Sequence, residues 1–109
     1  MKKGDIVLLP FPYTNLSGRK DRPALVLIED EFDITAAFIT SRIKWREETD
    51  MLLTPSKTNG LKAESLVRLN KLATIDKTMV LGILGTLAQH EMLELDRKLL
   101  KVLHINVKE

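Results

Sequence analysis

The sequence predicts a mainly β domain that carries one helix at its C-terminal end. Apolar and β-branched residues come in short runs that are bounded by proline, glycine or acidic clusters, as is typical of strands. Only residues 89–104 repeat their apolar positions with a helical period. With 109 residues, 44% of them hydrophobic, the chain is long enough for one domain, residues 1–109, with its own core. Short strands with one terminal helix favour a small, strongly bent β-barrel.

The first two strands are predicted at residues 6–9 and 24–28. Both are continuous apolar runs that are too short for a helix, and Pro10 ends the first. Residues 13–21 between them have no apolar period and contain several turn-forming residues. We therefore expect a polar surface loop at 13–21.

Three cations lie within four positions at the end of this loop: Arg19, Lys20 and Arg22. Pro23 disfavours helical geometry at the residue before it, so Arg22 is expected to be extended. Its guanidinium then projects from the first residue of a strand that is anchored in the core. A fixed cation beside a polar loop is the arrangement that the rest of the chain is expected to support.

The middle of the chain predicts two further strands. An acidic turn at 29–33 leads into a strand at 34–39, which ends on Thr40-Ser41. In residues 42–50, Ile43 and Trp45 alternate with charged residues before the segment becomes fully polar, so we expect a strand end that runs into a loop. Residues 51–54 form another short apolar run, and Asn59-Gly60 is a strong turn signal because both residue types tolerate positive φ.

Residues 65–69 and 72–75 predict one long strand or a bent pair, because apolar and polar side chains alternate through them. Asp76 begins a short turn or a single helical turn. Residues 80–87 are apolar but are interrupted by two glycines. Glycine costs stability inside a helix and often marks a bulge in a strand, so a strand is the favoured interpretation and a helix the alternative.

The terminal helix is predicted from Met92, Leu95, Leu99 and Val102, which are spaced three, four and three residues apart. This spacing places them on one stripe of a helix. Other leucines widen the stripe. We therefore expect the helix to cover one opening of the barrel and to offer a surface to a second subunit.

Composition excludes several classes of protein. Without cysteine the chain has neither a disulfide scaffold nor a thiolate metal site. The start Met1-Lys2-Lys3 is basic, but only four apolar residues follow before the prolines, so neither an export signal nor a membrane span is expected, and the cytoplasm is the default. Residues 1–28 and 51–80 each carry five cations and two anions. A local excess of positive charge attracts a phosphate backbone, although an ordinary solvated surface can show the same charge pattern.

Several segments resemble the MazF/PemK family of toxin ribonucleases from toxin-antitoxin modules. The matching segments are GDIV, FPYTNLSG and DRPALVL near the start, FITS at 38–41, and GLKAESLVRLNKLATIDK at 60–77. The resemblance implies an SH3-like β-barrel of the MazF/PemK/CcdB type and a homodimer. It also implies a sequence-selective endoribonuclease that cuts single-stranded mRNA with no metal or other cofactor, and an antitoxin partner with an acidic, disordered segment.

Metal-free RNA cleavage by the 2′-hydroxyl needs a proton acceptor, a proton donor and positive charge at the phosphate. The two histidines, His90 and His104, both fall on the terminal helix, so an acid–base pair of histidines is not expected. Arg22 is the best candidate for phosphate binding, because a guanidinium grips two oxygens and stays charged. The resemblance gives Arg22 and Thr40 catalytic roles; the alternatives are a surface ion pair and an ordinary strand residue.

The expected RNA-binding residues are Asn15, Arg19, Lys20, Ser41 and Arg68. Some family members have a catalytic arginine at the position of Arg68, with an acidic partner where this chain has Asn70. An amide cannot act as a general base, so Arg68 is expected only to contact phosphate.

Three aromatic residues are candidates for stacking on bases, Phe11, Tyr13 and Trp45, although the core competes for them. We expect Phe11 in the core and Tyr13 partly exposed; the pattern leaves Trp45 open. Two other functions remain: a toxin-like barrel that acts by binding topoisomerase or another protein, and a structural adaptor.

Overall fold

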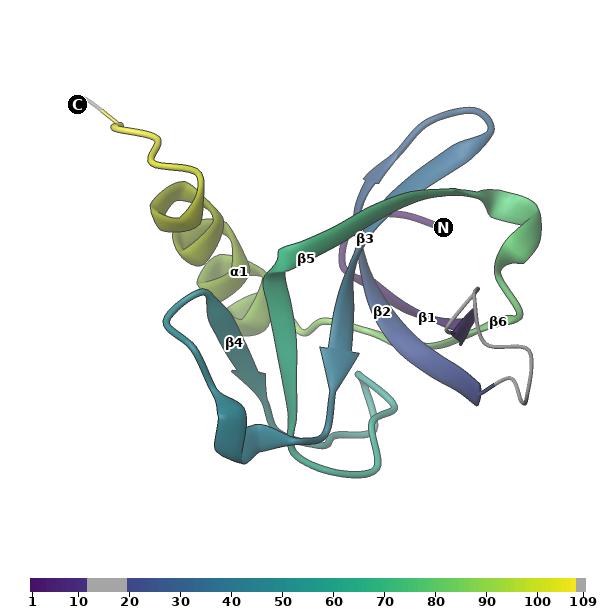
Figure 1. Ribbon diagram of the computed structural model, residues 1–109, viewed down its shortest axis with the longest axis horizontal. Coiled ribbons are helices and arrows are strands. Elements are labelled where there is room, and N and C mark those ends of the chain that lie inside the picture. The colour runs from purple at the N-terminus through teal and green to yellow at the C-terminus, as the bar shows by residue number, and fades with distance from the viewer. Residues whose placement is uncertain (12–19, 108–109) are drawn as a thin grey trace.

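The computed structural model describes residues 1–11 and 20–107, which form one curled antiparallel sheet and one long helix (Figure 1). The strands are β1 (Asp5–Phe11), β2 (Lys20–Glu29), β3 (Asp33–Thr40), β4 (Asp50–Leu53), β5 (Ser65–Asp76) and β6 (Gly82–Thr86). The helix is α1 (Gln89–Val102), and two 3-10 turns are η1 (Ile43–Trp45) and η2 (Lys77–Met79). The strand order is β4-β5-β3-β2-β1-β6. The predicted mainly β fold with a C-terminal helix is confirmed.

Strand β2 begins earlier than the sequence predicts. It pairs with β1 from Ile6 opposite Leu25 to Phe11 opposite Lys20. Lys20 and Asp21, predicted in the surface loop, therefore belong to the strand. The prediction was wrong here because backbone pairing with β1 extends the strand beyond its apolar part. The rest of the predicted loop, 13–19, lies outside the described residues.

Strand β5 is one long strand with a sharp bend (Figure 1), which agrees with the predicted long or bent strand. Against β3, the register passes from Ala37 opposite Leu72 to Phe38 opposite Arg68. The shift leaves residues 69–71 of β5 without partners in β3. Such bulges bend a strand and re-aim its side chains.

Strand β6 confirms the strand interpretation of residues 80–87. It pairs with β1, and its register shifts between Ile6 opposite Gly85 and Val7 opposite Ile83. The segment before β4 differs from prediction: residues 42–50 contain no strand until Asp50, and η1 forms instead. Alternation of apolar and charged side chains suggested a strand end, but none of the described strands pairs with residues 42–49.

The core has two parts, because β1, β2 and β3 bury side chains on both faces of the sheet. One cluster holds Ile6, Leu25, Ala37, Ile39, Met51, Leu53, Val67, Leu69, Leu87 and Leu95. The other holds Val7, Leu9, Ala24, Val26, Ile34 and Ala36.

Helix α1 covers the first of these clusters, as its apolar stripe predicted. Leu95 is fully buried, and Met92, Leu99 and Val102 pack beside it. The helix ends at Val102 rather than at the predicted residue 104, because His104 has a φ of 55°. No helix in the described part of the chain has the length and apolar character needed to cross a membrane.

The turn before β5 is held to the start of α1 by a buried amide. The Nδ2 of Asn59 donates to the Thr54 carbonyl at 2.8 Å and to Glu91 Oε2 at 3.3 Å. Glu91 in turn accepts the Ala88 N–H at 2.8 Å. Of the predicted Asn-Gly turn, only Gly60 has a positive φ, 71°. Asn59 contributes through its side chain instead, which backbone tolerance of positive φ did not predict.

Candidate functional site

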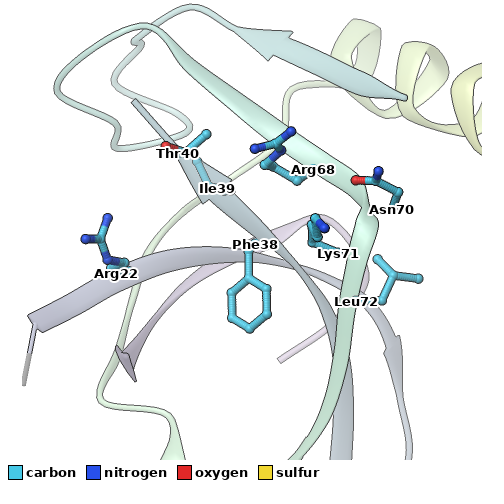
Figure 2. A pocket seen from close by; sticks show the side chains of 8 residues that line it. All are labelled: Arg22, Phe38, Ile39, Thr40, Arg68, Asn70, Lys71 and Leu72. Atoms are coloured by element: carbon cyan, nitrogen blue, oxygen red, sulfur yellow. The ribbon is translucent and has the colours of Figure 1, made fainter. Parts of the chain in front are cut away.

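A hollow of about 470 Å³, here called the central pocket, lies where strands β2, β3 and β5 come together. Its lining residues are Arg22, Phe38, Ile39, Thr40, Arg68, Asn70, Lys71 and Leu72. Figure 2 shows these side chains projecting from the three strands. Arg22 and Thr40, which the sequence singled out separately, therefore line the same pocket.

The register of β2 and β3 explains why these two residues meet. The ladder pairs Leu25 with Ala37 and Ala24 with Phe38. Continued by two residues, the same register sets Arg22 level with Thr40. Pro23 lies between, and its missing N–H cannot extend the ladder. Both side chains thus sit where two strand ends separate and leave room for a ligand.

The bulge in β5 supplies the opposite wall of the central pocket. Asn70 and Lys71 belong to the three residues that have no partner in β3, and both are exposed. Lys71 was not among the predicted site residues. In the sequence, Lys71 belongs to a polar pair between two leucines, which is typical of an ordinary exposed strand residue. Only the bulge in β5 brings its side chain to the central pocket.

Of the residues that the structure describes, three cations and no acidic residue line the central pocket: Arg22, Arg68 and Lys71. Arg68 is partly neutralised by two carboxylates behind the pocket. Its Nε lies 3.2 Å from Asp50 Oδ1, and its terminal nitrogen pairs with Glu47. Asp50 is fully buried and also accepts the Glu47 N–H at 2.8 Å. Arg68 is therefore held rigidly, and the pocket remains a site for an anion.

The Thr40 hydroxyl is oriented by the chain that follows it. Its Oγ1 accepts a hydrogen bond from the Arg42 N–H at 3.2 Å. A hydroxyl that accepts one bond still has its proton to donate. Thr40 can therefore donate to an oxygen of an anion in the central pocket.

A second hollow, the side pocket, has a volume of about 560 Å³ and shares Arg22 and Ile39 with the central pocket. Its lining also includes Lys20, Asp21, Ser41, Gly60, Leu61 and Lys62. Two predicted RNA contacts, Lys20 and Ser41, lie here rather than in the central pocket. Lys62 was not predicted.

The other predicted residues lie outside the described part of the chain or line neither of these two pockets. Asn15, Arg19 and Tyr13, like the side chain of Phe11, lie outside the described residues. His90 and His104 are exposed and line neither the central nor the side pocket.

Potential metal ligands are dispersed in the described part of the chain. Within residues 1–11 and 20–107, no three histidine, aspartate or glutamate side chains are grouped as ligands for a metal ion. We therefore assign no metal site among these residues.

Comparison with known proteins identifies a family model and a relative that both match almost the whole chain. Residues 2–103 match the family described as PemK-like, MazF-like toxin of type II toxin-antitoxin system. A protein of Mycolicibacterium smegmatis named probable endoribonuclease MazF is 30% identical over 112 residues, which cover 96% of this chain and 98% of that protein.

Two solved structures share the fold. One is described as an endoribonuclease in complex with its cognate antitoxin from a mycobacterial species; its TM-score is 0.76 at 16% identity, with 99% of each chain covered. The other is the Mycobacterium tuberculosis toxin MazF-mt6, with a TM-score of 0.73 at 20% identity, covering 94% of this chain and 99% of that one.

Proposed function

Because this chain belongs to the family of PemK-like, MazF-like toxins of type II toxin-antitoxin systems, we propose that it is a sequence-selective endoribonuclease that cleaves single-stranded mRNA and thereby inhibits growth. The observation that carries the proposal is the central pocket, where Arg22 and Thr40 line one hollow together with the cations Arg68 and Lys71. An mRNA target places the activity in the cytoplasm.

The proposed reaction is a transfer of the phosphoryl group within the RNA. The 2′-oxygen forms a bond to the adjacent phosphorus as the bond from phosphorus to the 5′-oxygen breaks. One proton leaves the 2′-hydroxyl and another joins the departing 5′-oxygen, which yields a 2′,3′-cyclic phosphate and a 5′-hydroxyl. Negative charge grows on the phosphate oxygens, so the enzyme must stabilise it there.

Arg22 and Thr40 have different roles in this step. The Arg22 guanidinium binds two phosphate oxygens and remains charged at every relevant pH, so it stabilises the growing charge without a metal. The Thr40 hydroxyl donates to the same phosphate and orients it for attack from the neighbouring ribose.

The remaining residues hold the RNA on either side of the cut. Lys71 adds an exposed cation to the central pocket, and Arg68 contacts phosphate from the position that its ion pairs fix. Lys20 and Ser41 bind the strand along the side pocket. Asn15 and Arg19, outside the described residues, keep their predicted roles in RNA contact.

The proposed partners follow from the same surfaces. An antitoxin with an acidic, disordered segment matches the cations of the two pockets in charge and would exclude RNA from them. A second copy of the chain would cover the outer leucines at α1, of which Leu93 in the helix and Leu103 directly after it are 53% and 56% exposed.

The test is cleavage of a long single-stranded RNA in excess EDTA, with the product ends identified. We expect wild type to cut and to leave cyclic phosphates. Removing one such charge-stabilising donor lowers the rate by about 10²–10³-fold, which we expect for Arg22→Ala, and a smaller loss is expected for Thr40→Ala. The matched control is Arg97→Ala, an exposed arginine of α1 that lines neither pocket.

Two results would contradict the proposal. One is RNA that stays intact with wild type although it is bound, particularly if a topoisomerase or another protein is captured instead. The other is cleavage by Arg22→Ala at the rate of Arg97→Ala, with both variants folded.

A further inference from the structure

The segment that follows Thr40 carries a third hollow, with a volume of about 540 Å³. It is lined by Ser41, Arg42, Ile43, Lys44 and Trp45, and we call it the loop pocket. We propose that the indole of Trp45 stacks on one unpaired base of the RNA next to the cut, while Arg42 and Lys44 bind its phosphates. This inference rests on the proposed function and adds a nucleotide-binding subsite to it.

The exposure of Trp45 is the first observation. It is the only tryptophan of the chain, and 64% of it is exposed although a core was available to bury it. Ile43 beside it is 39% exposed. Covering a large exposed ring with a flat apolar surface lowers the free energy, because apolar area is removed from water.

Cations alternate with these apolar side chains. Arg42, Lys44 and Arg46 flank Ile43 and Trp45 in sequence, and residues 41–46 include no acid. The Nζ of Lys44 lies 5.4 Å from the centre of the Trp45 ring, within range of a cation–π contact. An aromatic platform with cations at its rim is how proteins grip single-stranded nucleic acid.

The loop pocket is preformed. The Ile43 N–H donates to the Ser41 carbonyl at 3.0 Å, and the Arg46 N–H donates to the Ile43 carbonyl at 3.2 Å. The Arg42 N–H is bound to Thr40 at one end, and Glu47 is paired with Arg68 at the other. A platform fixed at both ends loses little conformational entropy when a ligand binds.

The position of the loop pocket selects RNA as its occupant. It shares Ser41 with the side pocket, which in turn shares Arg22 with the central pocket. A strand with its scissile phosphate at Arg22 therefore continues past Ser41 towards the Trp45 ring. Residues 41–46 carry three cations and no acidic side chain, which matches the charge of a phosphate backbone. A double helix keeps its bases stacked and cannot occupy the site.

Because the chain has one tryptophan, its fluorescence reports on Trp45 alone. The probe is a short single-stranded RNA of mixed sequence with 2′-fluoro groups, which block attack by the 2′-oxygen. We expect saturable quenching by the single strand and none by the same sequence as a duplex. Binding of the labelled probe is measured in parallel by fluorescence anisotropy.

Variants measure the size of the effect. Stacking on one base is worth about 1–3 kcal/mol, so Trp45→Ala should raise the Kd for the single strand by about 5- to 150-fold. Trp45→Phe should recover much of this loss. Lys44→Ala should lower the slope of log Kd against log salt by about 0.7, the value for one phosphate contact. The control is Phe32→Ala, a residue 68% exposed in the turn between β2 and β3, at the far end of that hairpin from Thr40.

The outcomes separate this inference from the proposed function. If wild type cuts RNA but Trp45 is not quenched by bound probe, or Trp45→Ala binds like Phe32→Ala, the stacking site is overturned and the enzyme stands. If quenching and weakened binding are found without cleavage, the stacking site stands and the proposed activity fails. Quenching by a second copy or by an acidic peptide, but not by RNA, overturns the site in favour of a protein contact.

Discussion

Removing the charge of Arg68 tests whether its ion pairs stabilise the wall of the central pocket. The substitution Arg68→Gln keeps a polar side chain of similar reach but leaves Asp50 without its cation. Asp50 has no exposed side-chain surface, and its remaining hydrogen bond comes from the Glu47 N–H. A buried carboxylate that loses its partner keeps the cost of its desolvation.

The size of the loss follows from the exposure of each partner. Breaking a fully buried pair costs about 3–5 kcal/mol. Since the Arg68 side chain is 22% exposed, water reaches part of this site, and we expect about 2–3 kcal/mol. Glu47 is 53% exposed, so Glu47→Gln should cost less than about 1 kcal/mol.

Urea unfolding followed by circular dichroism measures both losses. With a slope of about 1–3 kcal/mol per molar urea, Arg68→Gln should lower the midpoint by about 0.7–3 M. In a double-mutant cycle with Asp50→Asn, we expect a coupling of about 1–3 kcal/mol. Additive effects of the two substitutions would refute the reasoning, as would equal losses for Arg68→Gln and Glu47→Gln.

Three other substitutions test the packing and the surface charge. Gly85→Ala places a Cβ in steric clash with the Thr58 carbonyl oxygen, so stability in urea should fall by about 1–3 kcal/mol. Leu95→Ala empties a fully buried position and should lower the free energy of unfolding by about 2–5 kcal/mol. A hydrogen bond from Lys77, opposed by partial desolvation, lowers the pKa of Glu29 below 4.5. Glu29→Gln should therefore be less stable than wild type at pH 7, and this difference should vanish as the pH falls below that lowered pKa.

Each of these three predictions has a result that would contradict it. For Gly85→Ala and Leu95→Ala it is an unchanged urea midpoint. For Glu29→Gln it is a stability difference that persists, or grows, in acid, because the ionised carboxylate is the form that Lys77 stabilises.

Local patterns were sufficient to predict most elements of the fold. The spacing of Met92, Leu95 and Leu99 predicted the helix, because one face of it had to be apolar. Pro23 predicted an extended Arg22, and the structure finds Arg22 in β2, although as the third residue of that strand and not as its first. In these places the deciding interactions lie within a few residues of one another.

What the sequence did not predict depends on pairing between distant segments. Lys71 enters the central pocket only because β5 slips three residues against β3. Lys20 joins β2 because Phe11 lies opposite to pair with it. The buried amide of Asn59 is explained by Glu91, which lies 32 residues further along the chain. No pattern near Lys71, Lys20 or Asn59 contains the information about these partners.

The hydrogen bond between Asn59 and Glu91 lets the terminal helix support one wall of the side pocket. None of the described residues that line the central or side pocket belongs to α1. Gly60 and Leu61 nevertheless line the side pocket, and they come directly after Asn59, whose amide is hydrogen-bonded to Glu91. A truncation that deletes α1 should therefore deform the side pocket as well as uncover the core, and a displacement of the helix should also shift Gly60 and Leu61.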